Sequence, residues 1–163
     1  MKKILALALF GSLVLGGCAR QEPGVGRQEG IEAPDFTLKN IEGADVTLSS
    51  FKGVSPVLIV FWATWCPYCR EEMPNLVKLK EKYGPALEIM AIDIQESQKQ
   101  VASFVQAHRL NFTVLLDEEG AVAADYGLAG VPTMVLVDKE GKGVFADNRL
   151  SSEMLRLIAK LVV

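Results

Sequence analysis

The chain has 163 residues, of which 50% are hydrophobic, and a formal net charge of −3 at pH 7. This length allows one domain with a real core and a short appendage, and the hydrophobic content argues against disorder. The slightly acidic charge gives no reason to expect a nucleic-acid partner. Three cysteines and one histidine are too few for a multi-bridge disulfide scaffold and do not favour a structural zinc site. We therefore expect neither a metal nor a cofactor.

The first residues predict an export signal. Lys2 and Lys3 precede twelve mostly apolar residues, 4–15, a stretch that is too short to cross a bilayer. Leu15-Gly16-Gly17-Cys18 resembles the bacterial lipobox. This resemblance implies cleavage before Cys18 and lipid on the thiol of Cys18. A permanent membrane-anchor helix is the alternative interpretation.

A tether and a single domain are predicted to follow. From residue 19 to about residue 33 the composition changes to Gly, Gln, Glu, Arg and Pro, which is typical of a flexible linker. The predicted organisation is a signal peptide over 1–17, a lipidated cysteine and tether over 18–33, and one domain over 34–163. The expected location is exported, anchored to a membrane, and facing the periplasm or the cell exterior.

The domain alternates predicted strands with predicted helices. Apolar runs bounded by turn residues predict strands, and apolar residues at helical spacing predict helices. The predicted strands are 36–38, 46–48, 57–62, 87–92, 113–116, 133–137 and 144–146, and the predicted helices are 66–83, 97–109 and 151–162. The first two strands and the last two each read as a hairpin. This pattern predicts an α/β fold with a mixed, mainly parallel sheet that helices cover on both faces.

The strongest motif is Trp65-Cys66-Pro67-Tyr68-Cys69, which directly follows the third predicted strand and opens a helix. Pro67 fits the first helical position, where no backbone N–H is required. Cys66 then lies at the N-cap, where the helix dipole favours a thiolate. Cys69 lies one turn further on and can attack a mixed disulfide that forms on Cys66. An inert disulfide is the alternative, although so small a loop adds little stability.

Glu72 is a candidate proton carrier. At about 100° per residue, it falls within the apolar arc of the predicted helix, one turn from Cys69. A carboxyl group there would be partly desolvated and could pass protons to or from the buried thiol. The alternative is a side chain that leans out into solvent.

These motifs together resemble the thioredoxin family, and most closely its membrane-anchored TlpA/ResA-like branch. The resemblance rests on the segment 61–69 around the two cysteines, on Pro74 eight residues after Cys66, and on Val131-Pro132-Thr133. It covers nearly the whole domain. It implies a thioredoxin fold with an N-terminal β-hairpin and, over 97–117, a central insert of one helix and one strand.

The resemblance also implies further site residues. Val131-Pro132 should be a cis peptide bond beside the sulfurs, with a backbone that accepts a substrate strand. Glu72 matches an acidic residue of this branch, whereas Val60 stands where thioredoxin itself has a buried acid. The expected docking surface is formed by Trp62, Trp65, Pro67, Tyr68, Val131 and Pro132.

The leading functional hypothesis is a monomeric disulfide reductase outside the cytoplasm. It would reduce exported disulfide-containing proteins, with apocytochrome c as one family substrate. An integral-membrane electron donor would then return its own dithiol to the reduced form. The alternatives are a disulfide oxidase or isomerase, a peroxiredoxin-like thiol peroxidase, and a non-enzymatic lipoprotein that binds a partner. The peroxidase is disfavoured because Trp62-Ala63 offers no proline upstream of Cys66.

Overall fold

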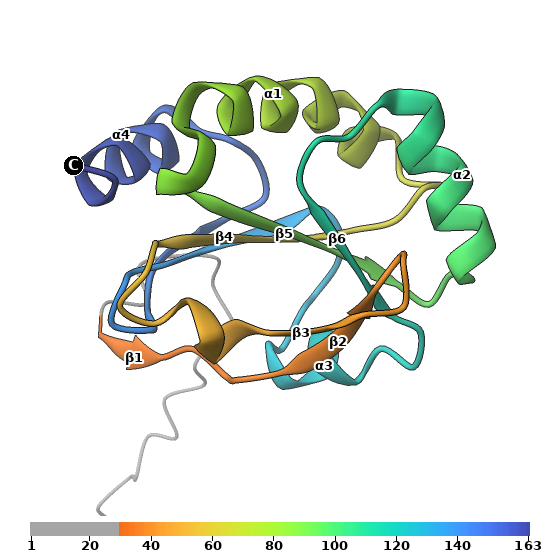
Figure 1. Ribbon diagram of the computed structural model, residues 1–163, viewed down its shortest axis with the longest axis horizontal. Helices are drawn as coiled ribbons and strands as arrows, with labels where there is room; N and C mark the ends of the chain where they lie inside the picture. Colours follow the sequence, from red (N-terminus) through yellow and green to blue (C-terminus); the bar gives the residue numbers. More distant parts are fainter. Residues whose placement is uncertain (1–29) are drawn as a thin grey trace, which may run out of the picture.

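The computed structural model describes residues 30–163, which are built around one eight-stranded sheet (Figure 1). The predicted signal peptide, Cys18 and the tether up to residue 29 lie outside the described residues. The strands are β1 (Ile31–Glu32), β2 (Thr37–Asn40), β3 (Asp45–Thr47), β4 (Val57–Trp62), β5 (Glu88–Ile94), β6 (Thr113–Asp117), β7 (Thr133–Val137) and β8 (Lys142–Asp147). The α-helices are α1 (Pro67–Tyr83), α2 (Gln98–His108), α3 (Ala121–Asp125) and α4 (Ser152–Leu161). Two short 3₁₀ helices, η1 (Leu48–Phe51) and η2 (Gly84–Ala86), complete the elements.

The strand order is β1-β8-β7-β4-β5-β6-β2-β3, with the fully buried β4 near the centre. The pairs β4–β5 and β5–β6 are parallel, and the other five pairings are antiparallel. The sheet is therefore mixed, as predicted, but the expectation of a mainly parallel sheet is wrong. Short turns join antiparallel strands, so the two hairpins supply two antiparallel pairings, and β1 with β8, β2 with β6 and β4 with β7 supply three more.

Both predicted hairpins are present. β2 pairs with β3, and β7 pairs with β8. Their turns contain Gly43 at φ 87° and Gly141 at φ 85°, a left-handed conformation that glycine adopts without a steric cost. β2 also pairs with β6, which joins the N-terminal hairpin to the main sheet.

Helices cover both faces of the sheet, as predicted. α1, α2 and α4 lie over one face, and α3 lies with the N-terminal hairpin on the other (Figure 1). The first core layer contains Leu76 of α1, Val101 of α2 and Ile158 of α4. The second layer contains Phe36 and Val122. Each helix therefore buries its apolar residues against a sheet face.

The predicted insert is present in the fold. α2 and β6 form the expected helix and strand between β5 and α3. The two residues of β1 pair with β8, so the sheet includes the last residues of the segment predicted as a tether. Within residues 30–163, no helix is both long enough and apolar enough to span a bilayer.

Candidate active site

The dithiol lies at the junction between β4 and α1. β4 ends at Trp62, and α1 begins at Pro67 with Cys66 as its N-cap, in extended backbone conformation. The Cys69 backbone N–H donates a hydrogen bond to Cys66 Sγ over 3.2 Å. This contact satisfies one of the backbone donors that a helix leaves unpaired at its first turn. The sulfur therefore lies at the positive end of the helix dipole, as predicted.

The two cysteines form a disulfide in this structure, with their Cα atoms 5.3 Å apart. Cys66 is 3% exposed and Cys69 is completely buried. The flanking aromatic residues are instead largely exposed to solvent, Trp65 by 66% and Tyr68 by 72%. A partner therefore meets the aromatic side chains before it reaches the sulfur of Cys66.

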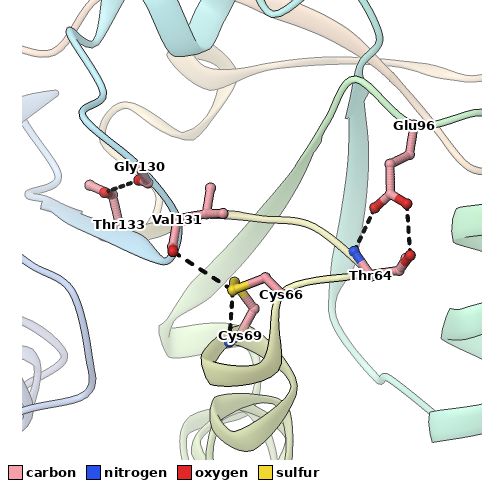
Figure 2. Close-up of a disulfide and its surroundings, with 7 residues drawn as sticks. All are labelled: Thr64, Cys66, Cys69, Glu96, Gly130, Val131 and Thr133. Carbon is pink, nitrogen blue, oxygen red and sulfur yellow. Dashed lines mark hydrogen bonds between the residues drawn. A yellow bond between two sulfur atoms is a disulfide. The ribbon is translucent and has the colours of Figure 1, made fainter.

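The loop before β7 faces the dithiol (Figure 2). The Val131-Pro132 peptide bond is cis, which confirms the expectation from the resemblance. The carbonyl oxygen of Val131 lies 3.7 Å from Cys66 Sγ. Within the same loop, the Thr133 hydroxyl donates to the Gly130 carbonyl over 2.8 Å. Tertiary folding thus brings residues 65 positions apart into contact at the sulfur.

A groove of about 640 Å³ runs beside this contact. One wall is formed by Tyr68, Glu71 and Glu72 of α1, and the other by residues 129–133 together with Asn148 and Arg149. Glu72 is half-buried, and its carboxylate accepts a hydrogen bond from the Asn75 side chain over 3.3 Å. The groove therefore unites three predicted site regions, namely Tyr68, Glu72 and the Val131-Pro132 loop.

Trp62 does not belong to the docking surface, so that part of the expectation is wrong. Its side chain is fully buried, and its ring packs against Phe104 of α2 with the centroids 5.2 Å apart. β4 is covered on both faces, so its last side chain points into the core. Trp65, Pro67 and Tyr68 are exposed.

A second group of polar residues lies behind the active-site loop, and the sequence reasoning missed it. Glu96 accepts hydrogen bonds from both the backbone N–H and the hydroxyl of Thr64, two residues before Cys66 (Figure 2). Asp93 of β5 is 1% exposed. Burial and the neighbouring Glu96 raise the pKa of Asp93 to about 8. The available signal was Asp93 within residues 89–94, which are otherwise apolar, because a buried strand rarely contains a carboxyl group.

Among residues 30–163, no group of three or more His, Cys, Asp or Glu side chains is placed to hold an ion.

The fold and the site define a thiol–disulfide oxidoreductase with a thioredoxin fold. A redox-active pair at a helix N-terminus, faced by a cis-proline loop, provides the nucleophile, the resolving thiol and a backbone edge for the substrate. The chain belongs to the AhpC/TSA family, whose model matches residues 30–144.

Individual relatives agree with this class. The thioredoxin-like protein YneN of Bacillus subtilis is 42% identical over 120 residues, which cover 72% of this chain and 69% of that protein. The thiol-disulfide oxidoreductase ResA of Bacillus anthracis is 39% identical over 118 residues, with coverages of 72% and 68%. This chain thus spans about two thirds of the length of these relatives.

Among solved structures, a secreted disulfide oxidoreductase of Mycobacterium tuberculosis, described as homologous to E. coli DsbE, superposes with a TM-score of 0.68. It is 30% identical in sequence, and the match covers 77% of this chain and 96% of that one. The fold and the dithiol chemistry that the sequence predicted are thereby confirmed.

Proposed function

We propose that this chain is an extracytoplasmic disulfide reductase that passes two electrons from a membrane donor to exported proteins. The observation that carries the proposal is the position of Cys66 Sγ, 3.7 Å from the Val131 carbonyl at the edge of the groove. A substrate strand that pairs with the Val131 backbone would bring its own disulfide to this sulfur.

The exchange proceeds in two balanced steps. The Cys66 thiolate attacks one sulfur of the substrate disulfide, forms a mixed disulfide, and releases the other substrate sulfur as a thiolate. The Cys69 thiolate then attacks Cys66, closes the Cys66–Cys69 bond seen here, and releases the second substrate thiolate. The substrate gains two electrons, and the membrane donor returns two electrons to this chain.

Charge around the site supports the reducing direction. Glu71 and Glu72 line the groove with a single cation, Arg149, and Glu96 binds Thr64 behind the loop. Negative charge near a thiol disfavours its thiolate and so opposes the effect of the helix N-terminus. A reduced form that is weakly stabilised gives its electrons away more readily, whereas a strongly stabilised one makes an oxidant.

Location and partners complete the proposal. A lipid chain on Cys18 and the tether before residue 30 would hold the domain at the membrane, within reach of an integral-membrane donor. The Mycobacterium tuberculosis neighbour is described as secreted, which supports action outside the cytoplasm. Exported proteins with disulfides are the proposed substrates, and apocytochrome c is the class that the family resemblance suggests.

The first experiment is the reduction potential of the Cys66–Cys69 couple, measured on the full-length chain in detergent against a thiol couple of known potential. A value near that of thioredoxin, about −270 mV, is expected for a reductase. A value near about −120 mV would mean an oxidant that inserts disulfides, and it would reverse the proposed direction.

Two variants separate the remaining alternatives. Cys66→Ser should abolish turnover with a disulfide substrate, whereas Cys69→Ser should form the mixed disulfide and retain it. A purely binding lipoprotein would keep its function in both variants. A thiol peroxidase would consume hydrogen peroxide faster than it reduces protein disulfides, and that ratio would overturn the reductase proposal.

A further inference from the structure

The strand beneath the active site carries a buried carboxyl group that no donor satisfies. Asp93 is 1% exposed, and neither of its carboxylate oxygens accepts a hydrogen bond from an N–H or O–H group of the described residues. Its register neighbours, Trp62 on β4 and Leu116 on β6, belong to the core layer that contains Cys66 and Cys69. Register neighbours in parallel strands point to the same face. Asp93 therefore faces the layer that holds the disulfide.

Glu96, three residues further on, has the opposite environment. Its carboxylate accepts two hydrogen bonds from Thr64 and one from the side-chain amide of Gln100. Gln95, between the two acids, has a φ of 60°, a left-handed conformation that is uncommon for residues other than glycine. Such a conformation persists where the surroundings hold it in place. The turn after β5 thus presents Glu96 to the loop that carries Cys66.

We propose that Asp93 and Glu96 share one proton behind the active-site loop and form a positioning pair that couples this proton to the redox state of Cys66 and Cys69. The side-chain oxygens of Glu96 accept three hydrogen bonds, whereas those of Asp93 accept none. A protonated Asp93 can itself donate to Glu96. Burial first, and then the charge of Glu96 and this hydrogen bond, raise the pKa of Asp93 to about 8. Two carboxyl groups in such different environments divide the roles of proton holder and acceptor.

The surroundings of Asp93 contain few other charges. The core layer on its face includes Trp62 of β4, Leu116 of β6, Cys66, Cys69 and Met73 of α1, and Val101 of α2. Within the described part of the chain, Glu96 is the one charged group that acts on Asp93. An ion pair between α1 and β5, Lys80 with Glu88 at 3.0 Å, lies at the opposite end of the strand. Among the buried residues of this layer the two cysteines are the other titratable groups, and the partly buried Tyr83 of α1 packs against it.

Reduction of the disulfide changes the charge in that layer. The disulfide is neutral, whereas reduction gives Cys66 a thiol at the N-terminus of α1, where its ionisation places a negative charge in the layer. Negative charges on the thiolate and on Asp93 disfavour each other, so the reduced protein should hold the Asp93 proton more tightly than the oxidised protein does. By linkage, ionisation of Asp93 disfavours the reduced form to the same extent.

The proton balance makes this coupling measurable. Below about pH 8 Asp93 keeps its proton in both redox states, so this proton does not enter the balance of the two-electron reduction. Above that pH the oxidised protein has lost the Asp93 proton, and reduction draws it back, so one further proton accompanies the two electrons. Each proton taken up with two electrons contributes about 30 mV per pH unit to the slope of the potential. The slope should therefore steepen by about 30 mV per pH unit above pH 8.

The test is the reduction potential of the full-length protein from pH 6 to pH 9.5, compared with that of Asp93→Asn. Asparagine keeps the size of the side chain and removes its titration. The wild-type protein should show the steeper segment, and Asp93→Asn should lack it. Asp125→Asn, which removes an exposed acid from α3, should behave as the wild-type protein does. Equal slopes in wild type and Asp93→Asn would overturn the proposal.

A second measurement needs no variant. The infrared carbonyl band of a protonated carboxyl group should be present in the oxidised wild-type protein at pH 7 and should disappear with a midpoint near pH 8. In the reduced protein the midpoint should lie at higher pH. An absent band at pH 7, or the same midpoint in both redox states, would overturn the proposal.

The inference rests on dithiol exchange and not on the direction of that exchange. An oxidising potential near neutral pH would overturn the reductase proposal and would leave the difference in slope as predicted. Equal slopes in wild type and Asp93→Asn, together with a reducing potential, would overturn the Asp93 proposal and leave the reductase proposal standing. The two failures are therefore distinguishable.

Discussion

At the scale of single residues, the active site is surrounded by carboxyl groups in contrasting environments. Glu72 is half-buried on the groove wall, with one hydrogen bond from Asn75. Asp93 lies within the sheet and meets no donor, so the cost of burying a charge keeps its proton in place. Glu72 can therefore contact a substrate in the groove, whereas Asp93 is in contact only with the core.

Replacement of Glu72 by Gln should slow thiol exchange near neutral pH by roughly a hundredfold, because a positioned acid or base typically contributes at least that much. The fold should be retained, since Glu72 is only partly buried. The measurement is the pH–rate profile of substrate reduction. Glu81→Gln, which removes an exposed acid further along the same helix, is the matched control and should change the rate little. A profile of Glu72→Gln that overlays the wild type would exclude the proton role.

Replacement of Asp93 by Asn should flatten the dependence of stability on pH. The folded protein raises the pKa of Asp93 from 3.8 to about 8, so between these values the native state binds a proton that the unfolded chain does not. The stabilisation is complete below pH 3.8 and is lost as the pH rises through 8. With about 1.4 kcal/mol for each pKa unit, Asp93→Asn should exceed the oxidised wild-type protein in stability at pH 8 by roughly 5 kcal/mol. Urea denaturation at a series of pH values measures this, and parallel stability curves would contradict it.

At the scale of elements, α1 delivers the dithiol and α4 supports the same face of the sheet. Pro67 fits the first turn of α1, and Cys66 caps it. Ser151 caps α4, where its hydroxyl oxygen accepts from the Met154 backbone N–H over 3.3 Å. Met154 and Ile158 of α4 are fully buried in the layer that also contains the two cysteines. The packing of α4 therefore contributes to the stability of the active-site layer.

Ile158→Ala should lower the free energy of unfolding by about 2–5 kcal/mol, because it leaves a cavity in a close-packed core. Leu155→Ala on the same helix is the matched control, since Leu155 is 40% exposed, and it should cost less than about 1 kcal/mol. Chemical denaturation of the three proteins measures the difference. Equal losses would show that α4 does not pack on this layer as described.

At the scale of the whole molecule, the sheet order assembles the site from three distant segments. The cysteines follow β4, the cis-proline loop precedes β7, and Glu96 follows β5. β4 lies between β7 and β5 in the sheet, so both segments flank the end of β4 that leads into Cys66. The proposed membrane tether adds a further level of organisation, because it would confine this site near its electron donor.

Cys18→Ser should shift the protein from the membrane fraction toward the soluble fraction, because stable attachment by lipid needs the acylated cysteine. Fractionation of cells and the mass of the N-terminal peptide measure the outcome. If the variant stays on the membrane with residues 1–17 intact, the segment 4–15 acts as an anchor, and the lipoprotein hypothesis is wrong.

Local signals allowed much of the site to be predicted. The start of α1 at Pro67, the N-cap at Cys66 and the hairpin turns depend on a few adjacent residues, and each was found where the sequence placed it. The environment of Trp62 was not predictable in this way, since its burial depends on α2 packing over it. The pairing of β2 with β6 likewise joins segments that no turn connects.

The sequence by itself determined the dithiol, its place at a helix N-terminus and the class of chemistry, because capping and turn preferences act over a few neighbouring residues. Only the tertiary structure decided which carboxyl groups surround the sulfurs. Asp93 is one charge in an apolar run until β4, β6 and the helices above them remove it from water, and Glu96 is an ordinary loop acid until the turn at Gln95 brings it to Thr64. Desolvation and contacts across 32 positions of sequence are properties of the folded chain, and the proton chemistry of this site depends on them.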